Sequence, residues 1–284
     1  MKISSLLKLT ASSAVLAAAA QFANAQTVWL VQPGTLVVTP SYSAQSFDEF
    51  YVGTAKMTLP ADLKQTSESA RFDYGISPSL ALDATIGYTE VKFSPPGASF
   101  KRGGRDDAKL GLSYALLSES SDMPAVTVRV GAIFAGNYSV PTTLPPINPG
   151  DGASGFETSL AAGKALGEGF AVYCEVGYRN RNHGVPDDFF GSVGVSKSFD
   201  AFTVNLGYRR EQSLSGGDIG GAGFGTKFGF PGVKQVQQFG EVGLAYTDGG
   251  GRNYQVFAAK SYGNIRNSGR ATIFGLSVSL PFKF

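Results

Sequence analysis

The chain has 284 residues, of which 43% are hydrophobic and 16% are charged, with 24 basic and 22 acidic side chains. This near-neutral balance, without a basic cluster, argues against nucleic acid or an anionic membrane surface as the main partner. The single cysteine, Cys174, excludes an intramolecular disulfide bond.

The first 25 residues read as a cleaved secretory signal peptide. Lys2 and Lys8 precede an apolar stretch, residues 9–20. Ala23-Asn24-Ala25 then places small residues where a signal peptidase cuts. We expect cleavage after Ala25, which leaves residues 26–284 as a single domain. The leader holds two lysines and no acid, so the remaining 259 residues carry 22 basic and 22 acidic side chains.

Polar and apolar residues alternate along most of the chain, as in β-strands whose two faces meet different surroundings. In the C-terminal stretch, Phe274, Leu276 and Val278 share one parity, and Gly275 and Ser277 share the other. No later run approaches the roughly 20 apolar residues of a membrane-spanning helix. The alternation predicts strands at residues 35–44, 66–76, 80–91, 106–117, 125–136, 155–165, 170–180, 188–199, 202–211, 234–247, 253–262 and 270–284.

The connections between these strands alternate in length. Tight turns are expected at residues 77–79, 118–124, 166–169, 200–201 and 248–251. Longer loops are expected at residues 45–65, 92–105, 137–154, 181–187, 212–233 and 263–269. Short periplasmic turns and longer extracellular loops produce this alternation in an even-stranded barrel with both ends inside the cell envelope.

The two faces of the predicted strands indicate a membrane barrel rather than a soluble one. An apolar row facing inward in a barrel of about twelve strands would leave a void that one layer of side chains cannot fill. Aromatic residues of the apolar parity gather at both strand ends, as membrane-interface girdles do. We therefore predict an all-β, transmembrane, antiparallel up-and-down barrel of about twelve strands, located in the cell outer membrane of a Gram-negative bacterium. The predicted girdle residues are Tyr74, Phe170, Phe199, Phe202, Tyr246, Tyr254 and Phe282 on the periplasmic side, and Tyr88, Phe134, Phe156, Tyr178, Phe189, Tyr208 and Phe274 on the outer side.

Charged residues of the polar parity lie deep within the strands and are candidates to line the lumen. These candidates are Arg71, Asp73, Asp83, Lys109, Arg129, Glu157, Glu175, Arg179, Arg209, Glu211 and Glu241. One hypothesis is a transverse field across a narrow lumen, with Arg71, Lys109 and Arg129 opposite Glu157, Glu175 and Glu241. The alternative is that these groups form internal ion pairs that fill a closed, structural barrel. Ile133, Tyr173, Phe190, Phe239 and Phe257 share the inward parity and would suit an aromatic or mildly apolar solute.

The sequence offers no catalytic constellation, and we expect no enzyme activity. The only histidine, His183, stands in a predicted outer loop without a neighbouring serine to activate. The acidic pairs Asp106-Asp107 and Asp187-Asp188 stand alone at outer strand ends, where solvated charges are favoured over Ca²⁺ or Mg²⁺ ligands. We expect no metal and no cofactor.

A glycine-rich stretch, residues 216–232, lacks the parallel strand and helix that a phosphate-binding loop requires. Its three phenylalanines, Phe224, Phe228 and Phe230, favour a loop that folds over or into the barrel mouth and narrows it. A flexible surface loop is the alternative.

Three segments carry a resemblance to a known family: Tyr42-Ser-Ala-Gln-Ser-Phe-Asp-Glu-Phe-Tyr51, Phe72-Asp-Tyr-Gly-Ile-Ser-Pro-Ser-Leu-Ala-Leu82 and Asp106-Asp-Ala-Lys-Leu-Gly-Leu-Ser-Tyr-Ala-Leu-Leu117. Over most of residues 26–284 the chain resembles the outer-membrane proteins grouped as "meta-pathway of phenol degradation". The resemblance implies a channel or transporter for aromatic or other small hydrophobic compounds. The terminal Phe282 and Phe284 resemble the assembly signal of bacterial outer-membrane barrels, which implies the barrel-assembly machinery as a partner.

The expected function is thus passage of small, hydrophobic or aromatic solutes through a narrow charged lumen. The alternative is a structural or adhesive barrel with a closed lumen that acts through its extracellular loops. The expected partners are outer-membrane lipid, lipopolysaccharide, the assembly machinery and the small-molecule cargo, and no nucleic acid is expected.

Overall fold

The structure of the chain is a computed structural model that describes residues 28–138 and 149–284. The predicted signal peptide and its cleavage site lie outside the described residues. Within these two ranges the regular elements are β-strands, and the search there finds no helix of the length and hydropathy needed to cross a membrane. The strands are β1 (Thr35–Val52), β2 (Ala55–Ser77), β3 (Leu80–Phe93), β4 (Phe100–Arg105), β5 (Ala108–Leu117), β6 (Ala125–Phe134), β7 (Gly155–Gly167), β8 (Phe170–Arg181), β9 (Asp188–Phe199), β10 (Phe202–Ser213), β11 (Val236–Thr247), β12 (Asn253–Ser261) and β13 (Thr272–Lys283).

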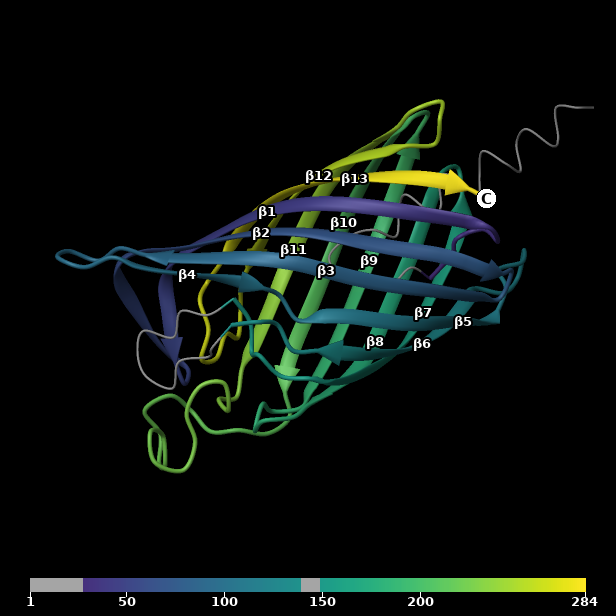
Figure 1. The fold of residues 1–284 in the computed structure, drawn as a ribbon. Coiled ribbons are helices and arrows are strands. Elements are labelled where there is room, and N and C mark those ends of the chain that lie inside the picture. The colour runs from purple at the N-terminus through teal and green to yellow at the C-terminus, as the bar shows by residue number, and fades with distance from the viewer. Residues whose placement is uncertain (1–27, 139–148) are drawn as a thin grey trace, which may run out of the picture.

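These strands form one antiparallel sheet that closes on itself into a barrel (Figure 1). Consecutive strands pair in order, and β1 pairs with both β2 and β13 to close the ring. Both β4 and β5 pair with β3, β4 with its later half and β5 with its earlier half. They form one strand interrupted at Asp106 and Asp107, so the closed barrel of the described residues has twelve strand positions. This confirms the predicted fold class. Closure removes the free edges of the barrel wall, whereas β4 pairs on one side only, with β3.

The barrel has two different ends. At one end, which we call the turn end, tight connections join β2 to β3, β5 to β6, β7 to β8, β9 to β10 and β11 to β12. The start of β1 and the C-terminus also lie there, because the Phe284 amide donates to the carbonyl of Gly34 at 2.8 Å. The opposite end, the loop end, carries the long β6–β7 and β10–β11 connections and two projecting hairpins (Figure 1).

Those two hairpins replace loops that the sequence predicts at residues 45–65 and 92–105. β1 continues to Val52 and β2 begins at Ala55, while β3 continues to Phe93 and is followed by β4. The predicted loops are wrong because these segments find apolar partners beyond the barrel wall. Leu59, Ala61 and Leu63 pack against Val91 and Phe93 of β3.

The barrel wall is apolar outside and polar inside. On β5, Leu110, Leu112 and Tyr114 are 50%, 38% and 47% exposed, while the alternate residue Ser113 is buried. The seven aromatic residues predicted for the turn-end girdle are all exposed there. This surface is the kind that contacts hydrocarbon, since bands of apolar side chains edged by aromatic rings surround membrane barrels.

Candidate functional site: the barrel lumen

A cavity of about 1260 Å³ lies inside the barrel. Its lining extends from Glu119 and Gly250 at the turn end to Asp107 and Pro149 at the loop end. All eleven residues proposed from the sequence to line the lumen do line this cavity: Arg71, Asp73, Asp83, Lys109, Arg129, Glu157, Glu175, Arg179, Arg209, Glu211 and Glu241. The cavity is therefore continuous along the barrel axis and is bordered by charges of both signs.

Arg129, on β6, is the centre of the most buried group of charges. Its guanidinium donates from Nε and Nη2 to the two carboxylate oxygens of Asp83 at 2.8 and 2.6 Å, and from Nη1 to Glu157 at 2.5 Å. The guanidinium lies over Gly111, where a side chain would collide with it, and over Gly131, where a side chain would lie only 3.0 Å from it. Glycine at these two inward positions thus makes room for the arginine to reach both neighbouring strands.

Glu157, on β7, is shared among three cations. Besides Arg129, it accepts a hydrogen bond from Lys109 Nζ at 3.0 Å and from Arg179 Nε at 3.2 Å, both to Oε2. Only 7% of its side chain is exposed. The carboxylate therefore joins β5, β6 and β8 to β7 through charge-assisted hydrogen bonds, which are stronger than neutral ones.

Further pairs continue this ionic lining around the barrel. Arg179 also binds Glu211, and Arg209 Nε lies 2.5 Å from Glu241 Oε1. Arg71 binds Asp73, two residues along the same strand, at 2.7 Å.

The hypothesis of a transverse field is therefore wrong in its arrangement. Lys109 and Arg129 are bound to Glu157, which that hypothesis placed opposite them. The reason is that these residues face inward on β5, β6 and β7, consecutive strands of the sheet. Opposite charges on neighbouring strands are close together, and their attraction is strong where the dielectric constant is reduced. They therefore form pairs with each other rather than with charges across the lumen.

Aromatic side chains interrupt the ionic lining at three places. Phe190, Phe239 and Phe257 border the cavity. The guanidinium of Arg209 lies 4.2 Å from the ring centre of Phe239, and that of Arg179 lies 5.1 Å from the ring centre of Phe190. The other two predicted inward residues, Ile133 and Tyr173, are buried and do not border the cavity.

An N-terminal segment, residues 28–32, enters the lumen at the turn end and borders the cavity. The carbonyl oxygen of Val28 accepts a hydrogen bond from Thr127 Oγ1 at 2.7 Å. Val28 and Trp29 pack with Ala125, Ala161 and Tyr173 on the inner wall. The lumenal position of this segment was not predicted from the sequence. The only available signal was a lone tryptophan and the small inward residues that make room for it.

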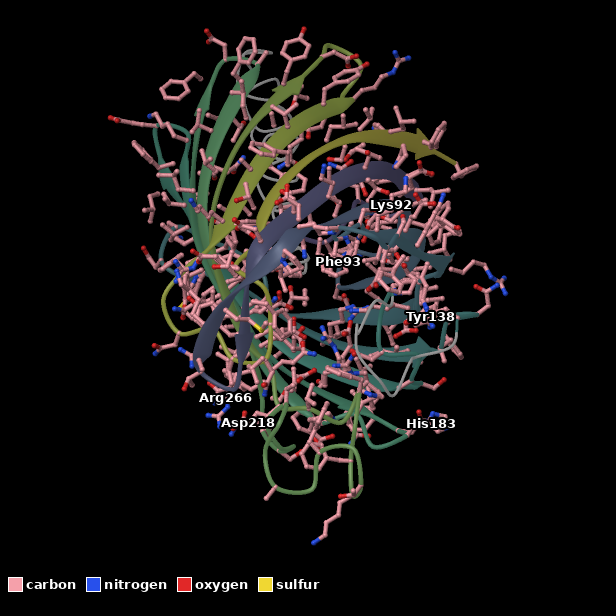
Figure 2. All side chains as sticks on the ribbon, turned by 90° about the vertical axis from the view of Figure 1, so that its left-hand side faces the viewer. Lys92, Phe93, Tyr138, His183, Asp218 and Arg266 are labelled. Carbon is pink, nitrogen blue, oxygen red and sulfur yellow. The ribbon has the colours of Figure 1, made fainter. Side chains whose placement is uncertain are left out.

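The glycine-rich loop between β10 and β11 does not narrow the cavity, since none of its residues borders it. Ile219, Phe230 and Val233 are buried and pack with Phe50 and Val52 of the β1–β2 hairpin. The loop instead packs on the hairpin tip, because its apolar side chains are buried against those of the hairpin. Arg266, in the β12–β13 connection, adds a bidentate ion pair to Asp218 at 2.7 and 2.5 Å (Figure 2).

The two acidic pairs at the loop end serve as structural links rather than as solvated charges. Asp107 accepts hydrogen bonds from the Gly136 amide at 2.8 Å and from the Tyr138 hydroxyl at 2.9 Å. Asp188 is 3% exposed and binds Arg181 at 2.5 Å. The described residues contain no group of three or more His, Cys, Asp or Glu side chains placed to hold a metal ion.

His183 lies exposed in the β8–β9 loop with a positive φ of 57° (Figure 2). It takes part in none of the hydrogen bonds or ion pairs that the described residues form around the lumen. The arrangement around the cavity is suited to binding and passing small solutes, because it combines paired charges with apolar rings.

Comparison with known proteins identifies the fold and not the family. The sequence matches no protein-family model and no curated protein. The crystal structure of the COG4313 outer membrane channel from Pseudomonas putida F1 is similar, with a TM-score of 0.74 and 12% identity, over 92% of this chain and 100% of that one. The translocator domain of the autotransporter NalP from Neisseria meningitidis has a TM-score of 0.51 and 11% identity, over 90% of each chain. The chain thus has the fold of outer-membrane β-barrels, whose solved members include channels, and its resemblance to the phenol-degradation family stays a resemblance.

Proposed function

We propose that the protein is an outer-membrane channel for small solutes. The observation that carries the proposal is a continuous, charge-lined cavity inside a barrel whose outer surface is apolar. Similarity of fold to the Pseudomonas putida channel supports it. No enzyme activity is proposed, because among the described residues the charged side chains of the lumen mostly pair with one another.

The test is the conductance of the purified, folded protein in a planar lipid bilayer. Single-channel steps above the lipid background are expected. Glu211→Gln is expected to alter the step size, because 43% of the Glu211 side chain is exposed in the lumen. Glu68→Gln, on the outward face opposite Tyr88, is the matched control and is expected to leave the step unchanged. Absence of current from correctly folded protein would contradict the proposal.

The proposed cargo is a small aromatic or hydrophobic compound. Phe190, Phe239 and Phe257 border the cavity, and arginines beside two of them can bind a carboxylate or a π-face. Benzoate and cyclohexanecarboxylate are a suitable pair of probes, because they have similar size and equal charge and differ in aromaticity. Liposome flux is expected to favour benzoate, and Phe239→Leu is expected to reduce that preference. Phe170→Leu, on the outer surface, is the control, and equal fluxes of the two probes through the unmodified channel would contradict the aromatic cargo.

The proposed route to the membrane begins with removal of residues 1–25 and ends with assembly through Phe282 and Phe284. Cleavage after Ala25 would start the protein two residues before Val28, the first described residue of the lumenal segment. Phe284 is 85% exposed and so is accessible to the assembly machinery. N-terminal sequencing of the membrane-inserted protein is expected to begin at Gln26. Deletion of Phe284 is expected to lower the amount of folded barrel in the outer membrane.

A second candidate function is a structural or adhesive barrel. It is favoured by the ordered platform at the loop end, where the glycine-rich loop packs on the β1–β2 hairpin. This function predicts no conductance and loss of adhesion when Phe50 and Phe230 are replaced together by serine. The bilayer measurement separates the two candidates, because only the channel produces current.

A further inference from the structure

Three lysines lie side by side on the outer surface of the barrel at the loop end. Lys64 on β2 is directly opposite Lys92 on β3, and Lys92 is directly opposite Lys101 on β4. We call them the lysine row. All three are exposed, and the alternate residues Val91 and Phe93 are buried. Lys92 and Phe93 are labelled in Figure 2.

The lysine row is unfavourable for the barrel by itself. Like charges directly opposite each other on neighbouring strands are destabilising. One carboxylate, Glu90, lies 2.7 Å from both Lys92 Nζ and Lys101 Nζ. Lys64 takes part in none of the ion pairs formed among the described residues, and Glu90 pairs with its two neighbours in the row instead. Two of the three ammonium groups thus share one carboxylate. Arg105, opposite Tyr88 on the same face, adds a further positive charge.

The position of the row relative to the apolar surface indicates what neutralises it. The outward residues of β3 change from Ile86 and Tyr88, which are 55% and 47% exposed, to Glu90 and Lys92. Lys92 is four residues beyond Tyr88, or about 13 Å along the strand at roughly 3.3 Å per residue. If Tyr88 marks the edge of the hydrocarbon, as aromatic girdles do, the row lies at the level of lipid headgroups.

We propose that the lysine row binds the phosphate groups of lipopolysaccharide in the outer leaflet. The inference rests on the proposed outer-membrane location. Short turns face the periplasm in such barrels, so the loop end and the row face the leaflet that contains this glycolipid. Lysine binds phosphate through charge-assisted hydrogen bonds.

The spacing of the row favours this glycolipid over a phospholipid. Neighbouring strands are about 4.8 Å apart, so the row extends over about 10 Å across three strands. That width suits a headgroup with two phosphates, as lipid A has, better than a headgroup with one. The β1–β2 and β3–β4 hairpins continue beyond the row and provide a wall for the attached sugars.

The test compares two triple variants of the full, folded protein in detergent. The first is Lys64→Gln, Lys92→Gln and Lys101→Gln. The control is Lys56→Gln, Lys227→Gln and Lys234→Gln, which removes the same charge from the hairpin tip and the glycine-rich loop. The probe is purified bis-phosphorylated lipid A, and binding is measured by native mass spectrometry and by the thermal unfolding temperature.

Lipid A is expected to bind and to raise the unfolding temperature of the unmodified protein and of the control. The row variant is expected to bind about tenfold or more weakly, since losing one hydrogen bond to a charged group already has about that effect. Without lipid A the row variant is expected to unfold at the same or a higher temperature, because like-charge repulsion is removed. Equal lipid A affinity of the row variant and the control overturns the proposal.

Three further measurements keep the outcome decisive. A variant in which all three lysines of the row are replaced by arginine is expected to bind lipid A as the unmodified protein does. If phosphatidylglycerol or inorganic phosphate raises the unfolding temperature as much as lipid A does, the assignment to the glycolipid fails. If the triple row variant does not fold, lipid A binding is measured for Lys92→Gln alone. Unchanged affinity of that variant for lipid A overturns the proposal.

Failure of this inference can be told apart from failure of the proposed function. If the protein conducts in a bilayer but does not bind lipid A, the channel proposal stands and the glycolipid site is refuted. If the protein binds lipid A through the lysine row but does not conduct, the glycolipid site stands and the channel proposal is refuted.

Discussion

The indole of Trp29 donates a hydrogen bond from Nε1 to Oε2 of Glu119, with 2.7 Å between the two atoms. The other oxygen of Glu119 accepts the backbone amide of Ala165 at 2.7 Å. One carboxylate in the β5–β6 turn thus holds the lumenal segment and the end of β7 together. This contact places an indole, the largest side chain available, at the turn end of the cavity.

Shortening Trp29 is expected to widen the turn end. Trp29→Ala removes the ring from the cavity border and is expected to raise the single-channel conductance in a planar bilayer. Trp29→Phe is the control, because it loses the hydrogen bond to Glu119 while it retains most of the ring volume, and a conductance near that of the unmodified protein is expected. The same conductance in all three proteins would show that residues 28–32 do not limit the passage.

Removing Arg129 is expected to destabilise the barrel strongly. Arg129→Gln leaves the carboxylate of Asp83, whose side chain is 4% exposed, without its bidentate partner. Breaking a buried pair from one side costs about 3–5 kcal/mol of unfolding free energy. Urea unfolding of the protein in lipid vesicles measures this loss.

Lys109→Gln is the matched control for that measurement. Its side chain is 31% exposed, and Glu157 retains Arg129 and Arg179 when Lys109 is neutralised. The expected loss is about 1 kcal/mol or less, as for partly solvated pairs. Equal losses in the two variants would contradict a central role of Arg129 in the lumen.

The lumen is expected to prefer cations weakly. Of the residues that the structure describes, nine acidic and seven basic side chains border the cavity, and most of them neutralise one another in local pairs. The small acidic excess favours cations, since lining charge sets ion selectivity. A reversal potential measured in a KCl gradient is expected to have the sign of K⁺ preference, and Glu211→Gln is expected to reduce it. A preference for Cl⁻ would contradict this reading of the lining.

Acid is expected to loosen the glycine-rich loop. The hydrogen bond from Arg266 lowers the pKa of the Asp218 carboxyl below its usual 3.8. A lowered pKa in the folded state means that the contact contributes its full stabilisation above pH 3.8 and loses it as the pH falls through the folded pKa. The contribution is small because the group is close to solvent.

The Ile219 amide reports on this contact, because it donates to Asn267, which in turn donates to Asp218 at 2.9 Å. Its hydrogen-exchange protection factor, corrected for the intrinsic rate, is expected to fall below pH 3.8. In Asp218→Asn the protection is expected to be low at neutral pH and to change little on acidification. An acid-induced fall of the same size in both proteins would place its origin elsewhere.

Local patterns in the sequence predict most of the barrel. The strand predicted at residues 188–199 has the bounds of β9, because turn-forming residues flank an alternating stretch. The hairpin extension at residues 55–65 was missed although Leu59, Ala61 and Leu63 form an apolar row there, because Pro60 lies within it and proline disfavours a strand interior. The break between β4 and β5 was missed for a different reason. Asp106 and Asp107 both border the lumen, which violates the alternation, and Thr89 and Tyr138 hold them from other parts of the chain.

The sequence by itself determined most of the strand positions within the barrel wall and which residues of these strands share a face, because each depends only on residues adjacent along the chain. Only the tertiary structure decided that Arg129 bridges Asp83 and Glu157 and that Trp29 reaches Glu119. These partners are 46, 28 and 90 residues apart, and their contact depends on strand register and barrel closure. Period-two alternation is the same in every register that keeps the faces, so it carries no information about which charges meet.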